Sequence, residues 1–150
     1  MMNKVQLRND RGIGDTAVDG LIAGLMAGVG MAIYLVIAGL LSSQGLVETL
    51  GLFDPALASN ALTGTVAHLA VSAIYGVVFG LIMTAVSKIW MSAFAWSWLM
   101  GLLYGLVLFG LARGMLLTAV NSPLLQVTSL HFALAHLVYG LILGYWLGKK

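Results

Sequence analysis

Four side chains that could do chemistry stand inside long apolar stretches of this sequence: His68, His131, His136 and Arg113. Ionisable groups within a membrane-spanning segment are costly to bury, and they mark functional sites by default. A spacing of five residues turns His131 and His136 about 140° apart around a helix, so at most one of them faces His68. Apart from Asp19 at the entrance of the first span, no carboxylate stands within a span to serve as a general base. The sequence therefore predicts no catalytic residue and disfavours an enzyme.

These four side chains have three interpretations. In the first they are structural: His136 bonds Ser72 across two packed helices, and Arg113 extends to the headgroups. In the second they hold a b-type haem, with His68 and one histidine of the last span as axial ligands and Arg113 pairing a propionate. In the third they line an oligomeric pathway for a small solute or proton. We favour the first, because buried polar groups in a membrane need partners even without a ligand. No cofactor or metal is then expected.

Composition sets the class of protein. Of the 150 residues, 61% are hydrophobic and only 8% are charged, whereas soluble domains carry roughly 25% charged residues. This predicts a single all-α domain embedded in a membrane. The absence of cysteine excludes disulfides, iron–sulfur clusters and thiol nucleophiles. A net charge of +2 is too small to indicate a nucleic-acid partner.

The apolar runs predict four transmembrane helices joined by short connections and one long loop. A polar segment, 1–16, precedes them, and the run that follows it is too long for a signal peptide. Within the long loop, Asp54-Pro55 predicts an N-cap and a proline at the first position of a short surface helix. The predicted spans are 17–41, 62–87, 94–119 and 127–147, and the long loop is 43–60.

The basic residues predict the orientation. With four spans, both termini and the connection between spans two and three share one side of the membrane. Six of the seven basic residues lie on that side: Lys4, Arg8, Arg11, Lys88, Lys149 and Lys150. By the positive-inside rule this side is cytoplasmic.

Glycines spaced four apart recur in every span, which is typical of close packing between transmembrane helices. Spans two and four align at an offset of 64 residues, which matches the Tyr-Gly pairs in each. Spans one and three align at an offset of 77. The sequence thus predicts two tandem helical hairpins of the same orientation, related by a pseudo-two-fold axis along the membrane normal. The predicted packing residues are Gly24, Gly28, Ser72, Tyr75, Gly76, Gly80, Gly101, Gly105, Tyr139, Gly140 and Gly144.

Two segments carry a resemblance to a known group. They are His68-Leu-Ala-Val-Ser-Ala-Ile-Tyr-Gly-Val-Val-Phe-Gly80 and His131-Phe-Ala-Leu-Ala-His-Leu-Val-Tyr-Gly-Leu-Ile-Leu-Gly144. They resemble segments of small four-helix bacterial membrane proteins of unknown function, the YagU-like group, over nearly all the chain from the first span onward. The resemblance implies a bacterial inner-membrane protein and implies no activity.

The glycine faces also bear on partners. Four helices with such faces have more close-packing surface than one small bundle uses, so at least one face is expected to meet another subunit. We therefore predict a non-catalytic accessory subunit of a larger membrane complex, with a hetero-complex favoured over a homo-oligomer. The alternatives are a small oligomeric transporter or channel and a haem-b-binding subunit.

Overall fold

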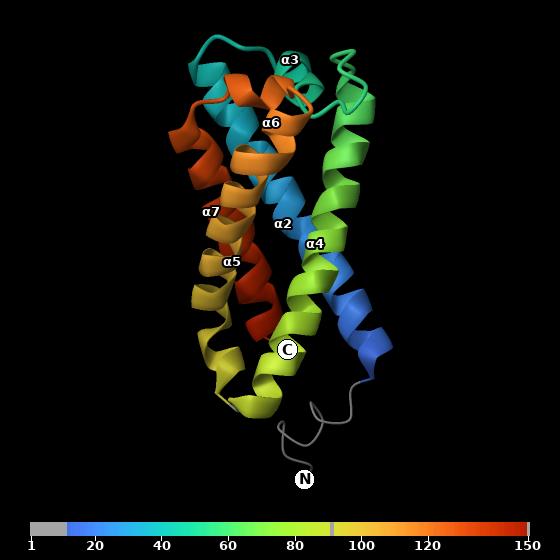
Figure 1. Ribbon diagram of the computed structural model, residues 1–150, viewed down its shortest axis with the longest axis vertical. Coiled ribbons are helices and arrows are strands. Elements are labelled where there is room, and N and C mark those ends of the chain that lie inside the picture. Colours follow the sequence, from blue (N-terminus) through green and yellow to red (C-terminus); the bar gives the residue numbers. More distant parts are fainter. Residues whose placement is uncertain (1–11, 91, 150) are drawn as a thin grey trace.

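The computed structural model describes residues 12–90 and 92–149, and every regular element in those ranges is helical. Four of the helical stretches are long and apolar enough to cross a membrane, which confirms the predicted all-α membrane architecture (Figure 1). Three are continuous: α2 (Ile13–Leu41), α4 (Ala61–Ile89) and α7 (Ser129–Gly148). The other is assembled from the 3-10 turn η1 (Ala93–Trp96), α5 (Ser97–Leu111), the π-helix η2 (Ala112–Leu116) and α6 (Leu117–Ala119).

The two ends of the bundle differ. At one end lie the start of α2, the connection from α4 to α5 and the end of α7 (Figure 1). We call this the terminal end. At the other end, the loop end, lie the short helix α3 (Leu46–Gly51) and the 3-10 turn η3 (Pro123–Gln126). Most of the predicted polar segment 1–16, with its three basic residues, and also Lys150 fall outside the described residues.

Each hairpin is held by glycine contacts between its own two helices. In the first, a Cβ added at Gly24 would collide with the carbonyl oxygen of Ser72 and the Cα of Gly76. In the second, a Cβ added at Gly105 would collide with the carbonyl oxygen of His136. Only a residue without a side chain lets two helix backbones approach this closely. The glycines therefore determine how closely the two helices of each hairpin approach one another.

These contacts correct the predicted register of spans one and three. Gly20 and Gly101 occupy equivalent places, because an added Cβ would meet the carbonyl oxygen of Gly76 in one hairpin and of Gly140 in the other. They lie 81 residues apart, so the predicted offset of 77 is wrong by one helical turn. The reason is that glycines four apart look alike after a shift of one turn, about 3.6 residues. Only the partner helix distinguishes the two registers.

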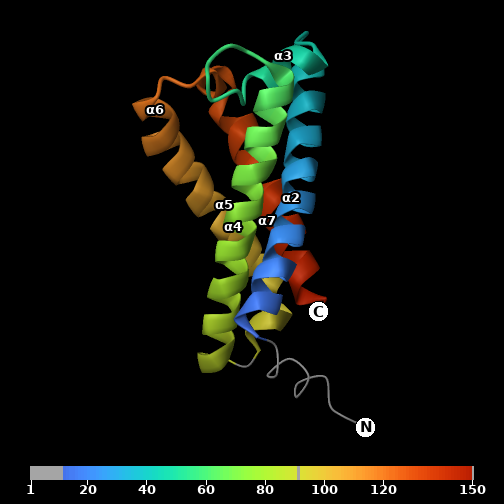
Figure 2. The same cartoon turned by 90° about the vertical axis from the view of Figure 1, so that its right-hand side faces the viewer.

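The two hairpins do not meet symmetrically. α2 packs along α7, whereas α4 and α5 touch only briefly. Figure 2 shows the far part of the third span, ending in α6, leaning away from α4. The π-helix η2 lies just before α6 in this span, and an extra residue in a helical turn shifts the faces beyond it. The two helix pairs that the pseudo-two-fold repeat relates therefore differ: α2 and α7 are packed together, which is the closed side, and α4 and α5 are largely apart, which is the open side.

The long loop corrects another prediction. No helix starts at Asp54-Pro55; instead α3 precedes it, and Asp54 is buried, with only 3% of its surface exposed. It accepts hydrogen bonds from the backbone N–H of Ala56 at 3.1 Å and of Asn60 at 3.0 Å. Asn60 is the residue that caps α4, accepting from two backbone N–H groups of its first turn. Because the Asp54 carboxylate accepts hydrogen bonds from backbone N–H groups of its own loop, it stabilises a turn and does not cap a helix.

Candidate functional site

All three histidines have hydrogen-bond partners within the chain. Nε2 of His68 lies 3.0 Å from the carbonyl oxygen of Gly28 on α2. Nδ1 of His131 lies 3.0 Å from the hydroxyl of Tyr34, also on α2. Nδ1 of His136 lies 2.8 Å from the carbonyl oxygen of Phe132, one turn earlier in its own helix. Each imidazole thus has the partner that a polar group inside a membrane requires.

The predicted bond between His136 and Ser72 is replaced by a different one. The residue of α7 that reaches Ser72 is Tyr139, whose hydroxyl donates to the Ser72 carbonyl at 2.7 Å. The His136 ring lies instead against Phe132, with ring centroids 4.6 Å apart. The physical reason is the repeat itself. Ser72 and His136 are equivalent positions of the two hairpins, so each faces its own hairpin partner and not the other.

A second tyrosine, which the sequence did not single out, also ties the hairpins together. The hydroxyl of Tyr104 on α5 donates to the carbonyl oxygen of Tyr75 on α4 at 3.0 Å. The ring of Tyr104 packs on Phe79, with centroids 5.0 Å apart. The sequence does carry a signal that could have identified Tyr34 and Tyr104. Each is a tyrosine inside an otherwise apolar span, and a buried tyrosine hydroxyl usually has a hydrogen-bond partner.

Arg113 holds a segment of backbone. Its guanidinium donates to the carbonyl oxygens of Val127 at 2.8 Å and of Leu125 at 3.4 Å. The Leu125 carbonyl belongs to η3, and the Val127 carbonyl belongs to the connection from η3 to α7. A planar guanidinium presents its donors in a fixed fork, so it suits two neighbouring acceptors. Arg113 therefore fixes the approach of the chain to α7 and contacts none of the histidines through these bonds.

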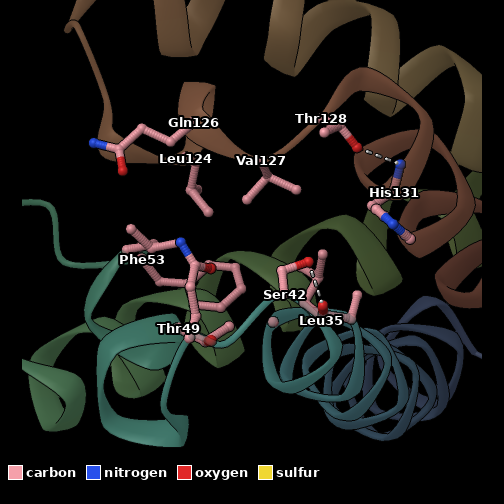
Figure 3. A pocket seen from close by; sticks show the side chains of 13 residues that line it. Leu35, Ser42, Thr49, Phe53, Leu124, Gln126, Val127, Thr128 and His131 are labelled. Atoms are coloured by element: carbon pink, nitrogen blue, oxygen red, sulfur yellow. Dashed lines mark hydrogen bonds between the residues drawn. The ribbon is translucent and has the colours of Figure 1, made fainter.

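A pocket of about 160 Å³ opens at the loop end, between the end of α2, α3, residues 124–128 and the start of α7. In Figure 3 the side chains of Leu124 and Val127 on one wall face those of Thr49 and Phe53 on the other. His131 lines the pocket, and Val127 is the residue whose carbonyl Arg113 holds. Of the four predicted chemical side chains, His131 lines this pocket, and Arg113 bonds to the backbone of its wall from outside the lining, whereas His68 and His136 are not part of the lining.

Two glycines of the third span differ from the rest. Gly110 at the end of α5 and Gly114 in η2 are exposed, and an added Cβ at either would meet no atom within 4 Å. The glycines earlier in the same span, Gly101 and Gly105, are both packed on α7. The sequence pattern is the same for all four, so only the structure separates the used face from the open one.

Within the described residues, no group of three or more histidine, aspartate or glutamate side chains lies close enough together to hold a metal ion. No protein-family model, curated protein sequence or solved structure matches the chain. The resemblance to the YagU-like group stays a prediction.

Proposed function

We propose that the protein is a non-catalytic accessory subunit that packs against a transmembrane helix of another chain through the far half of its third span. The observation that carries this proposal is the open space at Gly110 and Gly114. Association of helices in a membrane depends on close van der Waals packing, because lipid tails supply no hydrophobic force between helices. A small-residue face left without a partner in its own bundle suits a helix from a neighbour.

The broken symmetry of the repeat also leaves the third span with little cover from α4. The α2–α7 contact has no equal between α4 and α5, although the two pairs are related by the repeat. A third span with so few neighbours in its own bundle has room beside it for a helix of another chain.

The interior of the bundle supports a non-catalytic role. The three histidines and two of the interior tyrosines, Tyr104 and Tyr139, bond to groups of the chain itself, so the fold satisfies them without a ligand. For the location we propose a bacterial inner membrane, with both termini in the cytoplasm. The positive-inside rule supports this orientation, since Lys88 and Lys149 belong to the terminal end.

The test is recovery of partners with the full-length tagged protein, cross-linked in its native membrane and purified in mild detergent. Gly110→Leu should abolish recovery of the partner while leaving the thermal stability of the isolated protein unchanged. Gly14→Leu is the matched control, since Gly14 is another helical glycine with nothing within 4 Å. A wild type recovered alone, or equal losses in the two variants, would exclude the proposed interface. Recovery of only a second copy would identify a homo-oligomer.

A further inference from the structure

We propose that the pocket at the loop end binds a neutral polyhydroxyl group, of the size of glycerol or a single sugar ring. The ligand chemistry has two possible sources, a free polyol or the hydroxylated head of a membrane lipid. This binding role is separate from the subunit role, because the pocket and the open face at Gly110 share no residue.

The first step concerns charge. The pocket is lined by described residues only, and none of them is an aspartate, glutamate, lysine or arginine. The one histidine among them, His131, already shares a hydrogen bond with the Tyr34 hydroxyl. An ion placed there would lose its hydration without gaining a counter-charge, which is strongly unfavourable. The Arg113 side chain lies outside the lining and directs donors to carbonyls of the wall. The lining therefore favours a neutral ligand.

The second step concerns hydrogen bonding. The hydroxyls of Ser42 and Thr49 donate their own hydrogens to main-chain carbonyls, at 3.1 and 3.0 Å, and so keep lone pairs available as acceptors. The Thr128 hydroxyl accepts from the backbone N–H of His131 at 3.4 Å, so its hydrogen remains available to donate. The pocket thus presents both acceptors and a donor. A ligand hydroxyl, which donates and accepts at one oxygen, matches such a lining.

The third step concerns shape and the remaining wall. Gln44 and Gln126 add amide groups that donate and accept, while Phe53 and Leu124 supply apolar surface. Small-molecule sites combine apolar walls with a few placed polar groups in this way. A volume of about 160 Å³ is well above the roughly 10–15 Å³ that a single bound water needs, so the pocket has room for a small molecule. A triol or one sugar ring, with hydroxyls around an apolar carbon skeleton, has the matching size and polarity.

The position of the pocket leaves both sources open. It lies where α2 ends at Leu41 and α7 begins at Ser129, at the limit of the apolar spans. A polyol dissolved in the water outside the membrane can reach the boundary of the spans, and so can the headgroup of a membrane lipid. Arg113 acts here as a positioning residue, because it holds the backbone of the wall that contains Val127.

The experiment is ligand-observed saturation-transfer NMR on the full-length protein in nanodiscs made from lipids without sugar heads. The free probes are glycerol and glucose, the membrane-anchored probe is monoolein, and the charged probes of similar size are acetate and choline. Thr49→Val and Gln126→Leu each remove a polar group from the lining. Thr84→Val is the matched control. The Thr84 hydroxyl also donates to a helix carbonyl at 3.0 Å, but Thr84 lies near the terminal end of the bundle, away from the pocket.

We expect the neutral probes to bind and the charged probes not to bind. Each lining variant should weaken binding about fivefold, as the loss of one hydrogen bond does, and Thr84→Val should leave it unchanged. Binding of glycerol or glucose identifies a solution ligand, and binding of monoolein alone identifies a lipid head. Absence of binding by all neutral probes would overturn the proposal. Equal binding of acetate or choline, or an equal loss in Thr84→Val, would also overturn it. Gln126→Leu keeps the test decisive if Thr49→Val fails to fold.

Discussion

The hydroxyl of Tyr139 on α7 donates a hydrogen bond of 2.7 Å to the main-chain carbonyl of Ser72 on α4. The same carbonyl oxygen lies against Gly24 of α2, where no Cβ would fit. This one carbonyl therefore belongs to the interface within the first hairpin and to the bond that joins the two hairpins. The contact with Gly24 fixes the position of the Ser72 carbonyl, and Tyr139 donates its hydrogen bond to that carbonyl.

Tyr139→Phe should lower the stability of the folded bundle by about 1 kcal/mol, the typical size of an interhelical hydrogen bond in a membrane. Tyr145→Phe, at a tyrosine that is 57% exposed, is the control and should change little. Both free energies of unfolding are measured in the same detergent. Equal effects of the two changes would mean that the Tyr139 bond contributes nothing specific.

Gly76→Ala should be strongly destabilising, because the added Cβ would collide with backbone atoms of Gly20 and Gly24. Forcing two packed helices apart costs about 1–3 kcal/mol. Gly14→Ala should be neutral or slightly stabilising, since alanine is the better helix former and Gly14 has open space around it. Thermal denaturation of both variants in detergent is the measurement. A neutral Gly76→Ala would contradict the observed interface.

Asp54 should make the long loop sensitive to acid. Hydrogen bonds, above all from the backbone N–H of Asn60, lower the pKa of its carboxyl, although burial opposes the shift. A folded-state pKa below the unfolded one gives stability that is present above the unfolded pKa, about 4, and is lost as the pH falls through the folded pKa. The stability difference between wild type and Asp54→Asn should therefore be constant from pH 8 to about 5 and shrink below about pH 4.

The measurement for Asp54 is thermal denaturation of wild type and Asp54→Asn over that pH range. The difference between them removes the contribution of every other group. A difference that grows on acidification would show that the carboxylate does not stabilise the loop.

Arg113→Lys should loosen η3 and its connection to α7, even though it preserves the positive charge. An ammonium lacks the planar fork that serves two neighbouring carbonyls. Loss of about 1.4 kcal/mol of local protection corresponds to a tenfold faster amide exchange, so peptides covering residues 122–128 should exchange about tenfold faster by hydrogen–deuterium exchange. Peptides covering 54–60 are the internal control and should be unchanged. Unaltered exchange at 122–128 would show that charge alone, and not the two hydrogen bonds, matters at this position.

The histidines separate the remaining interpretations. His136→Gln retains a donor and an acceptor, so the fold should survive it, and the purified wild type should show no Soret band. If the wild type contains stoichiometric haem and His68→Gln or His136→Gln removes it, the haem interpretation replaces the structural one. Absorption spectra and mass measurement of the same purified samples decide this.

The sequence alone determined the class of the protein. Runs of apolar residues longer than a bilayer crossing, with few charges, leave a helix as the only satisfied backbone. The four spans and the tandem hairpins therefore follow from local pattern. The sequence also identified Arg113 and His131 as residues to explain, and the structure places both beside one pocket. The resemblance, the orientation and the partners remain predictions.

The tertiary structure decided the register of the repeat and the hydrogen-bond partners of the buried side chains. A shift of one helical turn leaves the same face of a helix toward its neighbour, so glycines four apart allow both an offset of 77 and the observed 81. Hydrogen-bond partners depend on which helices face one another: Ser72 and His136 each face their own hairpin partner, and Tyr139 is the residue of α7 that reaches Ser72. The burial of Asp54 and the lean of the third span beyond η2 likewise depend on contacts between segments distant in sequence. Local pattern specifies which faces of a helix are able to pack closely, and only the tertiary structure specifies which of them do so and which turn of the neighbour they meet.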